Sequence, residues 1–192
     1  MSLGALKSLI QWIRPPVARD CRSGRFVAVI DCVLNQNVRD RGAASFPAMN
    51  FELLQLCHEQ GIGVMQMPCP EVSALGLKRE RPAGMTVRQA LDTDAGRLCC
   101  ANLAASVATQ MQILVDEGFT LVAVLGGNPR SPGCAVHAVQ GRLTDDSGLF
   151  MLALQAELSQ RGIEVPFRGV RDTSSAMLAD DLQWFRNLLR AT

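Results

Sequence analysis

Three cysteines each follow a short apolar run, and thiols in that position could bind a metal. Cys32 follows the run FVAVID, Cys69 follows GVMQMP, and Cys134 lies in the turn after LVAVLGG. If these runs are neighbouring parallel strands, their ends lie on one edge of the sheet, where open α/β folds bind their ligands. The sequence therefore predicts that three thiols converge at one point.

The number of thiols bears on the kind of site. Structural zinc prefers four protein ligands, whereas a catalytic metal keeps a position open for water or substrate. Cysteine thiolates also hold iron–sulfur clusters, normally with four ligands. Three ligands would leave one iron free, although any one buried cysteine taken alone is commonly a small core residue.

The other four cysteines do not suggest a redox pair. Cys21, Cys57, Cys99 and Cys100 include no Cys-x-x-Cys spacing, so we expect them to fill the core or lie on the surface. Seven is an odd number, and 48% of the chain is hydrophobic, which argues against a secreted disulfide framework. A cytoplasmic location is the expectation.

Composition favours one domain acting on a small molecule. The chain has 192 residues and a formal net charge of +1, so nothing in it indicates bulk attraction to nucleic acid or to an anionic membrane. It has no Tyr and two Trp, too few aromatic residues for stacking a single strand. We therefore expect a small substrate, with no nucleic acid polymer and no membrane as partner.

Apolar runs alternate with helical patterns along the chain. Strands are expected at 26–31, 62–67, 119–125 and 164–170, with a short extension at 136–139. Helices are expected at 51–59, at 86–117 with a break near Gly96, from Asp146 or Ser147 as N-cap to 161, and from 174 or 175 to 189. This alternation predicts a mainly parallel sheet with right-handed crossovers.

Residues 1–24 are expected to form an N-terminal helix and linker before a domain at 25–192. Apolar residues recur at helical spacing in the first segment, at Leu3, Leu6, Ile10 and Ile13. The segment lacks the pattern of a signal peptide, and no stretch approaches the roughly 20 apolar residues of a membrane span. We expect the helix to pack on the domain or on a second subunit, which leaves a homodimer open.

Three short motifs in this order resemble one enzyme family. The loop DCVLNQNVR at 31–39, the turn PCPE at 68–71 and the turn SPGC at 131–134 are similar to the thiouracil desulfidase (TudS) family. The runs 62–77 and 148–169 resemble more narrowly a TudS-related desulfidase branch. The third motif departs from the usual pattern, because Gly133 stands where the family has a second serine.

The resemblance implies a single Rossmann-like, three-layer α/β domain that holds a four-iron four-sulfur (4Fe-4S) cluster. Carried over by motif, Cys32, Cys69 and Cys134 would be its ligands, and the fourth iron would take the sulfur of a substrate such as 2-thiouracil. Glu71 would be an acid/base group, and Ser131 would be a second catalytic residue lining the pocket. The products would be the oxo compound and sulfide.

The chemistry of such a reaction can also be argued from the residues. Replacing a C=S sulfur by oxygen needs a Lewis acid that prefers soft ligands, and a carboxylate near it to move protons. A uracil-like ring presents carbonyl and N–H edges, for which Asn35, Asn37 and Asn128 are candidate substrate-binding residues by position. Arg39 would stabilise negative charge or hold the loop through a carboxylate.

Other interpretations remain open at this stage. Glu71 could simply order its loop by pairing with Arg79 or Arg81. The chain could be a sulfur-transfer protein that passes sulfur to an acceptor, or a non-catalytic module that binds a cluster or zinc. A nucleotide-binding domain is disfavoured, because Gly126 and Gly127 belong to no complete Gly-x-Gly-x-x-Gly motif and no Walker lysine follows them.

Overall fold

The computed structural model describes residues 20–191, and the expected N-terminal helix lies outside this range. The sheet consists of four parallel strands in the order β2-β1-β3-β6. Their bounds are Arg25–Ile30 for β1, Gly63–Met67 for β2, Thr120–Gly126 for β3 and Phe167–Gly169 for β6. β1 and β2 pair without a register shift, and Ala28 lies opposite Met65.

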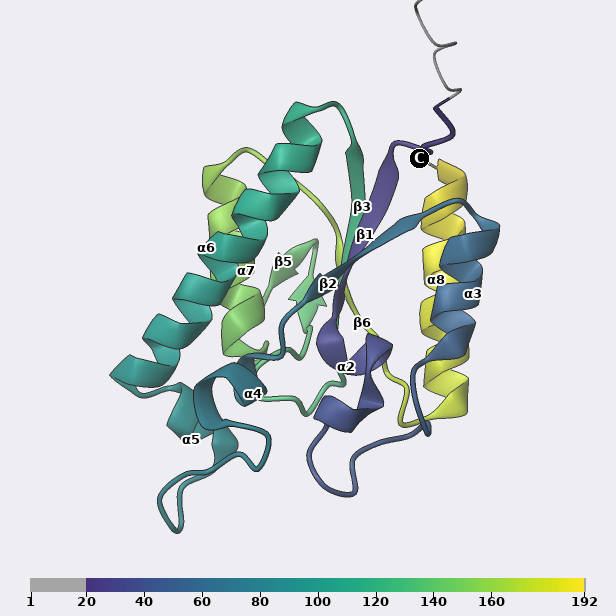
Figure 1. The fold of residues 1–192 in the computed structure, drawn as a ribbon. Helices are drawn as coiled ribbons and strands as arrows, with labels where there is room; N and C mark the ends of the chain where they lie inside the picture. Colours follow the sequence, from purple (N-terminus) through teal and green to yellow (C-terminus); the bar gives the residue numbers. More distant parts are fainter. Residues whose placement is uncertain (1–19, 192) are drawn as a thin grey trace, which may run out of the picture.

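Helices cover both faces of this sheet, which makes three layers (Figure 1). One face carries α3 and α8, and the other carries α6 and α7. Their bounds are Phe51–Glu59 for α3, Asp94–Asp116 for α6, Leu149–Gln160 for α7 and Ser175–Ala191 for α8. The prediction of a single Rossmann-like α/β domain with a mainly parallel sheet is confirmed.

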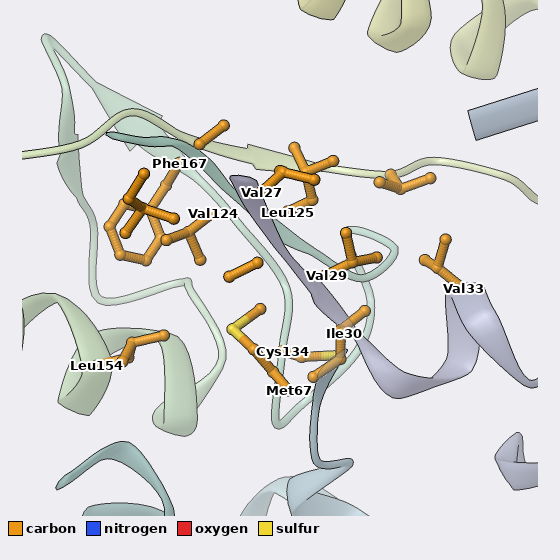
Figure 2. Close-up of a cluster of buried hydrophobic side chains, with 14 of the residues drawn as sticks. Val27, Val29, Ile30, Val33, Met67, Val124, Leu125, Cys134, Leu154 and Phe167 are labelled. Carbon is orange, nitrogen blue, oxygen red and sulfur yellow. The ribbon is translucent and has the colours of Figure 1, made fainter. Parts of the chain in front are cut away.

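The central strands explain why their sequences are continuously apolar. β1 and β3 are buried almost throughout because helices cover both of their faces. Figure 2 shows the core that results: Val124 of β3 lies on the side of the sheet that faces Leu154 of α7, whereas Val27 of β1 lies on the opposite side. The chain proceeds from β1 to one side as β2 and then to the other side as β3. The strand order therefore reverses between β1 and β3, and ligands bind at such switch points in open α/β sheets.

Short helices and a two-stranded hairpin connect the longer strands and helices. These are α2 (Asp31–Leu34), the 3₁₀ helix η1 (Gln36–Val38), α4 (Pro70–Leu75), α5 (Val87–Leu91), β4 (Ala138–Val139) and β5 (Arg142–Leu143). The expected extension at 136–139 is instead the start of an antiparallel β4–β5 hairpin. The last strand is also shorter than predicted, since only 167–169 pair with β3.

The helix expected at 86–117 is divided near Gly96, as predicted, into α5 and α6. The division lies at Asp92 and Thr93, because Thr93 caps α6 by accepting a 3.2 Å hydrogen bond from the Gly96 amide. Gly96 lies within α6, where a Cβ would come within 2.6 Å of the Ala90 carbonyl oxygen. The glycine therefore permits close packing of α5 against α6.

The expected cap of α7 is also wrong. Gly148 is the N-cap residue, and neither Asp146 nor Ser147 caps the helix. The Ser147 hydroxyl instead accepts from the His137 amide at 3.0 Å and donates to the His137 carbonyl at 2.9 Å. Gly148 lies against the backbone of Gly133, where a Cβ would overlap the chain.

Among the described residues, one helix is long and apolar enough to cross a membrane by length and composition. This helix is α6, and its buried residues lie at helical spacing on one face. They include Cys100, Ala104, Val107 and Met111. That face packs against α7 and β3.

Candidate active site

The ends of the three longer strands bring the predicted cysteines to one cavity. Cys32 lies in α2 directly after β1, Cys69 is the N-cap residue of α4 after β2, and Cys134 follows β3. All three line a cavity of about 400 Å³, together with Glu71 and Ser131. The convergence that the sequence suggested is therefore present at the carboxyl edge of the sheet.

Close backbone packing fixes the position of Cys134. The Gly127 amide donates a 2.8 Å hydrogen bond to the Cys134 carbonyl, which folds the loop back onto the end of β3. A Cβ at Gly127 would lie 2.6 Å from Cys134 Sγ, so no larger residue fits there without moving the sulfur. The glycine directly after β3, Gly127, is thus explained by its contact with Cys134.

Ser131 connects the carboxylate to a cysteine. Its hydroxyl donates to Glu71 Oε1 at 2.9 Å, and the same oxygen lies 3.0 Å from Cys134 Sγ. The single hydroxyl proton has two acceptors in reach, a carboxylate oxygen and a sulfur. Glu71, Ser131 and Cys134 therefore form a continuous polar chain in the wall of the cavity.

Arg79 holds Glu71 from the other side. Its Nε lies 3.4 Å from Glu71 Oε2, and its Nη2 lies 3.8 Å from Cys69 Sγ. Arg79 is buried and also donates to the carbonyls of Val38 and Leu77. Arg81 is not the partner of Glu71, since its Nε donates to the Met85 carbonyl and its Nη1 donates to the Arg79 carbonyl.

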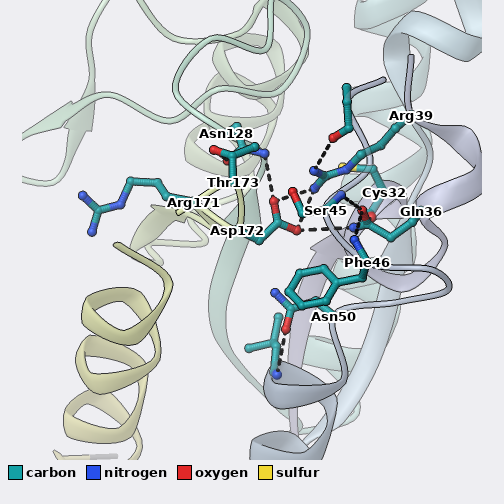
Figure 3. Close-up of polar contacts among 12 residues, drawn as sticks. Cys32, Gln36, Arg39, Ser45, Phe46, Asn50, Asn128, Arg171, Asp172 and Thr173 are labelled. Carbon is teal, nitrogen blue, oxygen red and sulfur yellow. Dashed lines mark hydrogen bonds and ion pairs between the residues drawn. The ribbon is translucent and has the colours of Figure 1, made fainter. Parts of the chain in front are cut away.

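A second polar group lies on the Cys32 side of the cavity (Figure 3). Arg39 Nη2 donates to both carboxylate oxygens of Asp172 at 2.7 Å and lies 3.9 Å from Cys32 Sγ. Asn128 Nδ2 donates to the same carboxylate at 2.9 Å. Arg39 was expected to hold its loop by pairing with a carboxylate. That carboxylate is Asp172, from the loop after β6.

The three thiols differ in acidity. The Cys134 thiol donates a hydrogen bond to Cys32 Sγ, which lowers the pKa of Cys32, and the nearby Arg39 guanidinium lowers it further against the effect of burial. The same bond and burial raise the pKa of Cys134 well above its ordinary value. Burial raises the pKa of Cys69 to about 11. Cys32 is thus the thiol that most readily becomes a thiolate.

Asn35 and Asn37 lie outside this cavity. Both are exposed, and Asn35 Oδ1 caps η1 by accepting from the Asn37 amide at 3.2 Å. Asn37 Nδ2 donates to the same oxygen at 2.9 Å. Of the four residues predicted to bind substrate, the structure places Arg39 and Asn128 at the cavity.

Three thiols in one cavity wall are the type of donor that iron–sulfur clusters use. In residues 20–191, no group of three His, Cys, Asp or Glu side chains is arranged to hold one metal ion. Ligands of a cluster bind different irons, so they surround a volume and need not meet at a point. Arg39 Nε is buried without an acceptor in the described chain, as expected of a donor whose partner is a bound group.

Asp172 and Gln36 were not predicted as parts of the site: Asp172 binds Arg39, which lines the cavity, and Gln36 donates to Asp172. Asp172 lies just past the end of β6, in the same relation to its strand as Cys32 to β1. The rule that selected the cysteines would have selected Asp172 had it been applied to every strand end. Gln36, in η1, carried no such signal, whereas Arg79 was named from the sequence only as a possible partner of Glu71 and also lines the cavity.

Comparisons with known proteins find a distant relative of this chain but no family. No protein family model matches it. It is 25% identical over 124 residues to an uncharacterized protein of Methanocaldococcus jannaschii, covering 64% of this chain and 76% of that protein. No solved structure matches it. The class of protein is thus described by its own fold and site. It is a Rossmann-like α/β domain with a thiol-lined cavity at the switch point of the sheet.

Proposed function

We propose that this protein is a desulfidase that replaces the sulfur of a thiolated small molecule, such as 2-thiouracil, by oxygen. One observation carries the proposal: Cys32, Cys69 and Cys134 line one cavity with Glu71 and Ser131. The motifs that hold these five residues are those that resemble the thiouracil desulfidase family. Acyl, phosphoryl and hydride transfer would each leave three convergent thiols without a role.

The three cysteines would hold a four-iron four-sulfur cluster. When bound by three protein ligands, such a cluster supplies an iron that acts as a soft Lewis acid toward the sulfur of the substrate. Arg39 stabilises negative charge at Cys32, since its Nη2 lies 3.9 Å from that sulfur. The wall of the cavity is otherwise partly apolar, with Val87 and Pro132 among its residues, which limits the access of water.

The proposed reaction balances without an electron donor or acceptor. A thiocarbonyl and water give a carbonyl and hydrogen sulfide: a C–O bond forms, the C–S bond breaks, and both protons of the water end on sulfur. Glu71 is the group that accepts a proton from water and delivers it to the departing sulfur. Ser131 and Arg79 fix its two oxygens, at 2.9 Å and 3.4 Å respectively.

The cavity suits a small heterocycle. Its volume of about 400 Å³ lies in the range of small-molecule sites. Asn128 uses one amide hydrogen on Asp172 and keeps a second, which can donate to a ring carbonyl. Cys32, Cys69 and Cys134 are free thiols, which supports a reducing, cytoplasmic location for the enzyme.

The first experiment measures iron and acid-labile sulfide in protein prepared without oxygen, followed by turnover of 2-thiouracil. We expect about four of each per chain, the content of a cubane cluster, and equal amounts of uracil and free sulfide. Protein with neither iron nor sulfide would overturn the proposal. Sulfur recovered on an added thiol acceptor would instead indicate a sulfur-transfer protein, and a stable cluster with no turnover of any thiolated base would indicate a binding module.

A further inference from the structure

Asp172, just past the end of β6, is a buried carboxylate that accepts from donors at two other strand ends. Its side chain is 0% exposed, and it accepts from Arg39 Nη2 on both oxygens at 2.7 Å. It also accepts from Asn128 Nδ2 at 2.9 Å and from Gln36 Nε2 at 3.3 Å. Figure 3 shows these groups meeting at one carboxylate. Asp172 thus ties the loop after β6 to the loops after β1 and β3.

Arg39 is held rigidly by this arrangement, and one of its donors is left over. Its side chain is 6% exposed, Nη1 donates to the Ala43 carbonyl at 3.1 Å, and Nη2 is shared between Asp172 and Cys32 Sγ. Nε is buried and has no acceptor in residues 20–191. A buried donor without a partner is destabilising, and Arg39 also lines the cavity beside Cys32, so its guanidinium is placed to bind an acceptor there.

The chemistry around this donor limits what the acceptor can be. The guanidinium carries a positive charge in a buried setting, which favours an anionic acceptor. Cys32 Sγ is its neighbour, and the cavity is lined by two further thiols. An anionic sulfur atom satisfies both conditions: either a sulfur of a bound cluster or the sulfur of a thiolated substrate.

We propose that Arg39 is the hydrogen-bond donor to an anionic sulfur bound in the cavity, and that Asp172 is the positioning residue that holds Arg39 in place. The identity of that sulfur rests on the function proposed above, whereas the donor site itself does not. Asp172 touches neither substrate nor cluster. It acts by fixing the guanidinium plane beside Cys32.

A matched control lies on the same side of the sheet. Asp181 of α8 is also buried and also binds two arginines, with 2.8 Å to Arg168 Nε and 2.7 Å to Arg171 Nη2. It lines no part of the cavity that holds the cysteines. Asp181→Asn therefore removes a buried carboxylate of the same chemistry that does not contact Arg39, although it also accepts from the Arg171 amide next to Asp172 at 2.9 Å.

The first arm of the test uses metal-free protein and does not depend on the proposed function. Binding of thiosulfate, a small anion with a terminal sulfur, is compared with binding of sulfate in the wild type, Arg39→Lys, Asp172→Asn and Asp181→Asn. We expect the wild type to prefer thiosulfate and the first two variants to bind it about tenfold more weakly, as for loss of one hydrogen bond to a charged group. Asp181→Asn should match the wild type.

The second arm uses protein reconstituted with iron and sulfide without oxygen, and measures the reduction potential of the cluster. Hydrogen bonds to sulfur raise such potentials, so Arg39→Lys should shift the potential in the negative direction. Removing a carboxylate by itself would shift it in the positive direction. A negative shift in Asp172→Asn therefore indicates that Asp172 acts through Arg39, which a merely structural role would not produce.

The outcomes separate the alternatives. A shifted potential indicates that Arg39 donates to sulfur of the cluster or of its ligand Cys32, which lies 3.9 Å from Nη2, whereas an unchanged potential with weaker thiosulfate binding identifies the substrate sulfur. Unchanged binding and unchanged potential in Arg39→Lys would overturn the inference, and this variant remains informative if Asp172→Asn does not fold. A wild type that takes up no iron but shows the Arg39-dependent preference for thiosulfate would remove the desulfidase proposal and leave the donor site standing.

Discussion

Ser131 donates a hydrogen bond of 2.9 Å to Glu71 although 60 positions separate them in the chain. The bond joins the loop after β3 to the first turn of α4, and these loops also carry Cys134 and Cys69. The same hydroxyl lies 3.0 Å from Cys134 Sγ. Ser131 therefore contacts both the proposed proton-transfer group, Glu71, and a proposed cluster ligand, Cys134. This relationship leads to the first prediction.

Glu71→Gln should abolish turnover while the protein keeps its iron. The amide preserves the size of the side chain and can still accept from Ser131, but it cannot take a proton from water. We expect the kcat for 2-thiouracil to fall by about 10²–10⁴, the usual contribution of general acid–base catalysis. Glu80→Gln is the control, since Glu80 is exposed in the same region and does not line the cavity. Full activity in Glu71→Gln would exclude this carboxylate from the mechanism.

Replacing any one of Cys32, Cys69 and Cys134 by serine should remove the cluster. A hydroxyl is a harder and far less acidic ligand than a thiol, so iron bound to it is readily lost. Iron per chain after anaerobic reconstitution is the measurement. Cys100→Ala serves as control, because Cys100 is a buried core residue of α6 that lies outside the cavity wall. Equal loss of iron in Cys100→Ala would mean that folding, not ligation, is being measured.

Gly127→Ala should disturb the site through a single methyl group. That Cβ would lie 2.6 Å from Cys134 Sγ, closer than side-chain contacts allow, so the sulfur must move. We expect iron content to fall and the thermal midpoint to drop by several degrees, as for a loss of about 1–3 kcal/mol by overpacking. In Gly63→Ala the new Cβ meets its nearest atom at an ordinary 3.5 Å, and both quantities should stay near those of the wild type.

Stability should fall above pH 9 partly because of Cys57. Burial raises the pKa of this thiol to about 11 in the folded protein, from an ordinary value of 9.0. The unfolded chain therefore loses this proton first, and the stability present below pH 9 is lost as the pH rises toward 11. The difference of about two pKa units amounts to at most about 2–3 kcal/mol.

Denaturant unfolding of metal-free protein between pH 8 and 11 measures that effect. Cys57→Ala should flatten the dependence of the unfolding free energy on pH, whatever it costs in packing at pH 8. Leu56→Ala truncates a buried neighbour on the same helix that does not titrate, and it should keep the wild-type slope. A slope that is the same in Cys57→Ala and the wild type would contradict the assignment to this thiol.

The apolar runs by themselves determined the sheet and the position of two cysteines at its edge. FVAVI and LVAVLG are continuous because helices cover both faces of central parallel strands, and a residue just past such a run must lie at the carboxyl edge. Spacing alone thus placed Cys32 and Cys69 at this edge, whereas Cys134 is brought there by the loop that folds back onto the end of β3. The fold class followed from the alternation of these runs with helical segments.

Tertiary structure decided which polar residues join the cysteines. Asn35 and Asn37 sit close to Cys32 in the chain, yet the 3₁₀ turn at η1 directs them to solvent, whereas Asp172 arrives from 133 positions beyond Arg39. The start of α6 was likewise set by the Thr93 cap. Periodicity reports which residues face a core, but a buried charge is placed by its partners, and those partners are known only once the strand ends lie side by side.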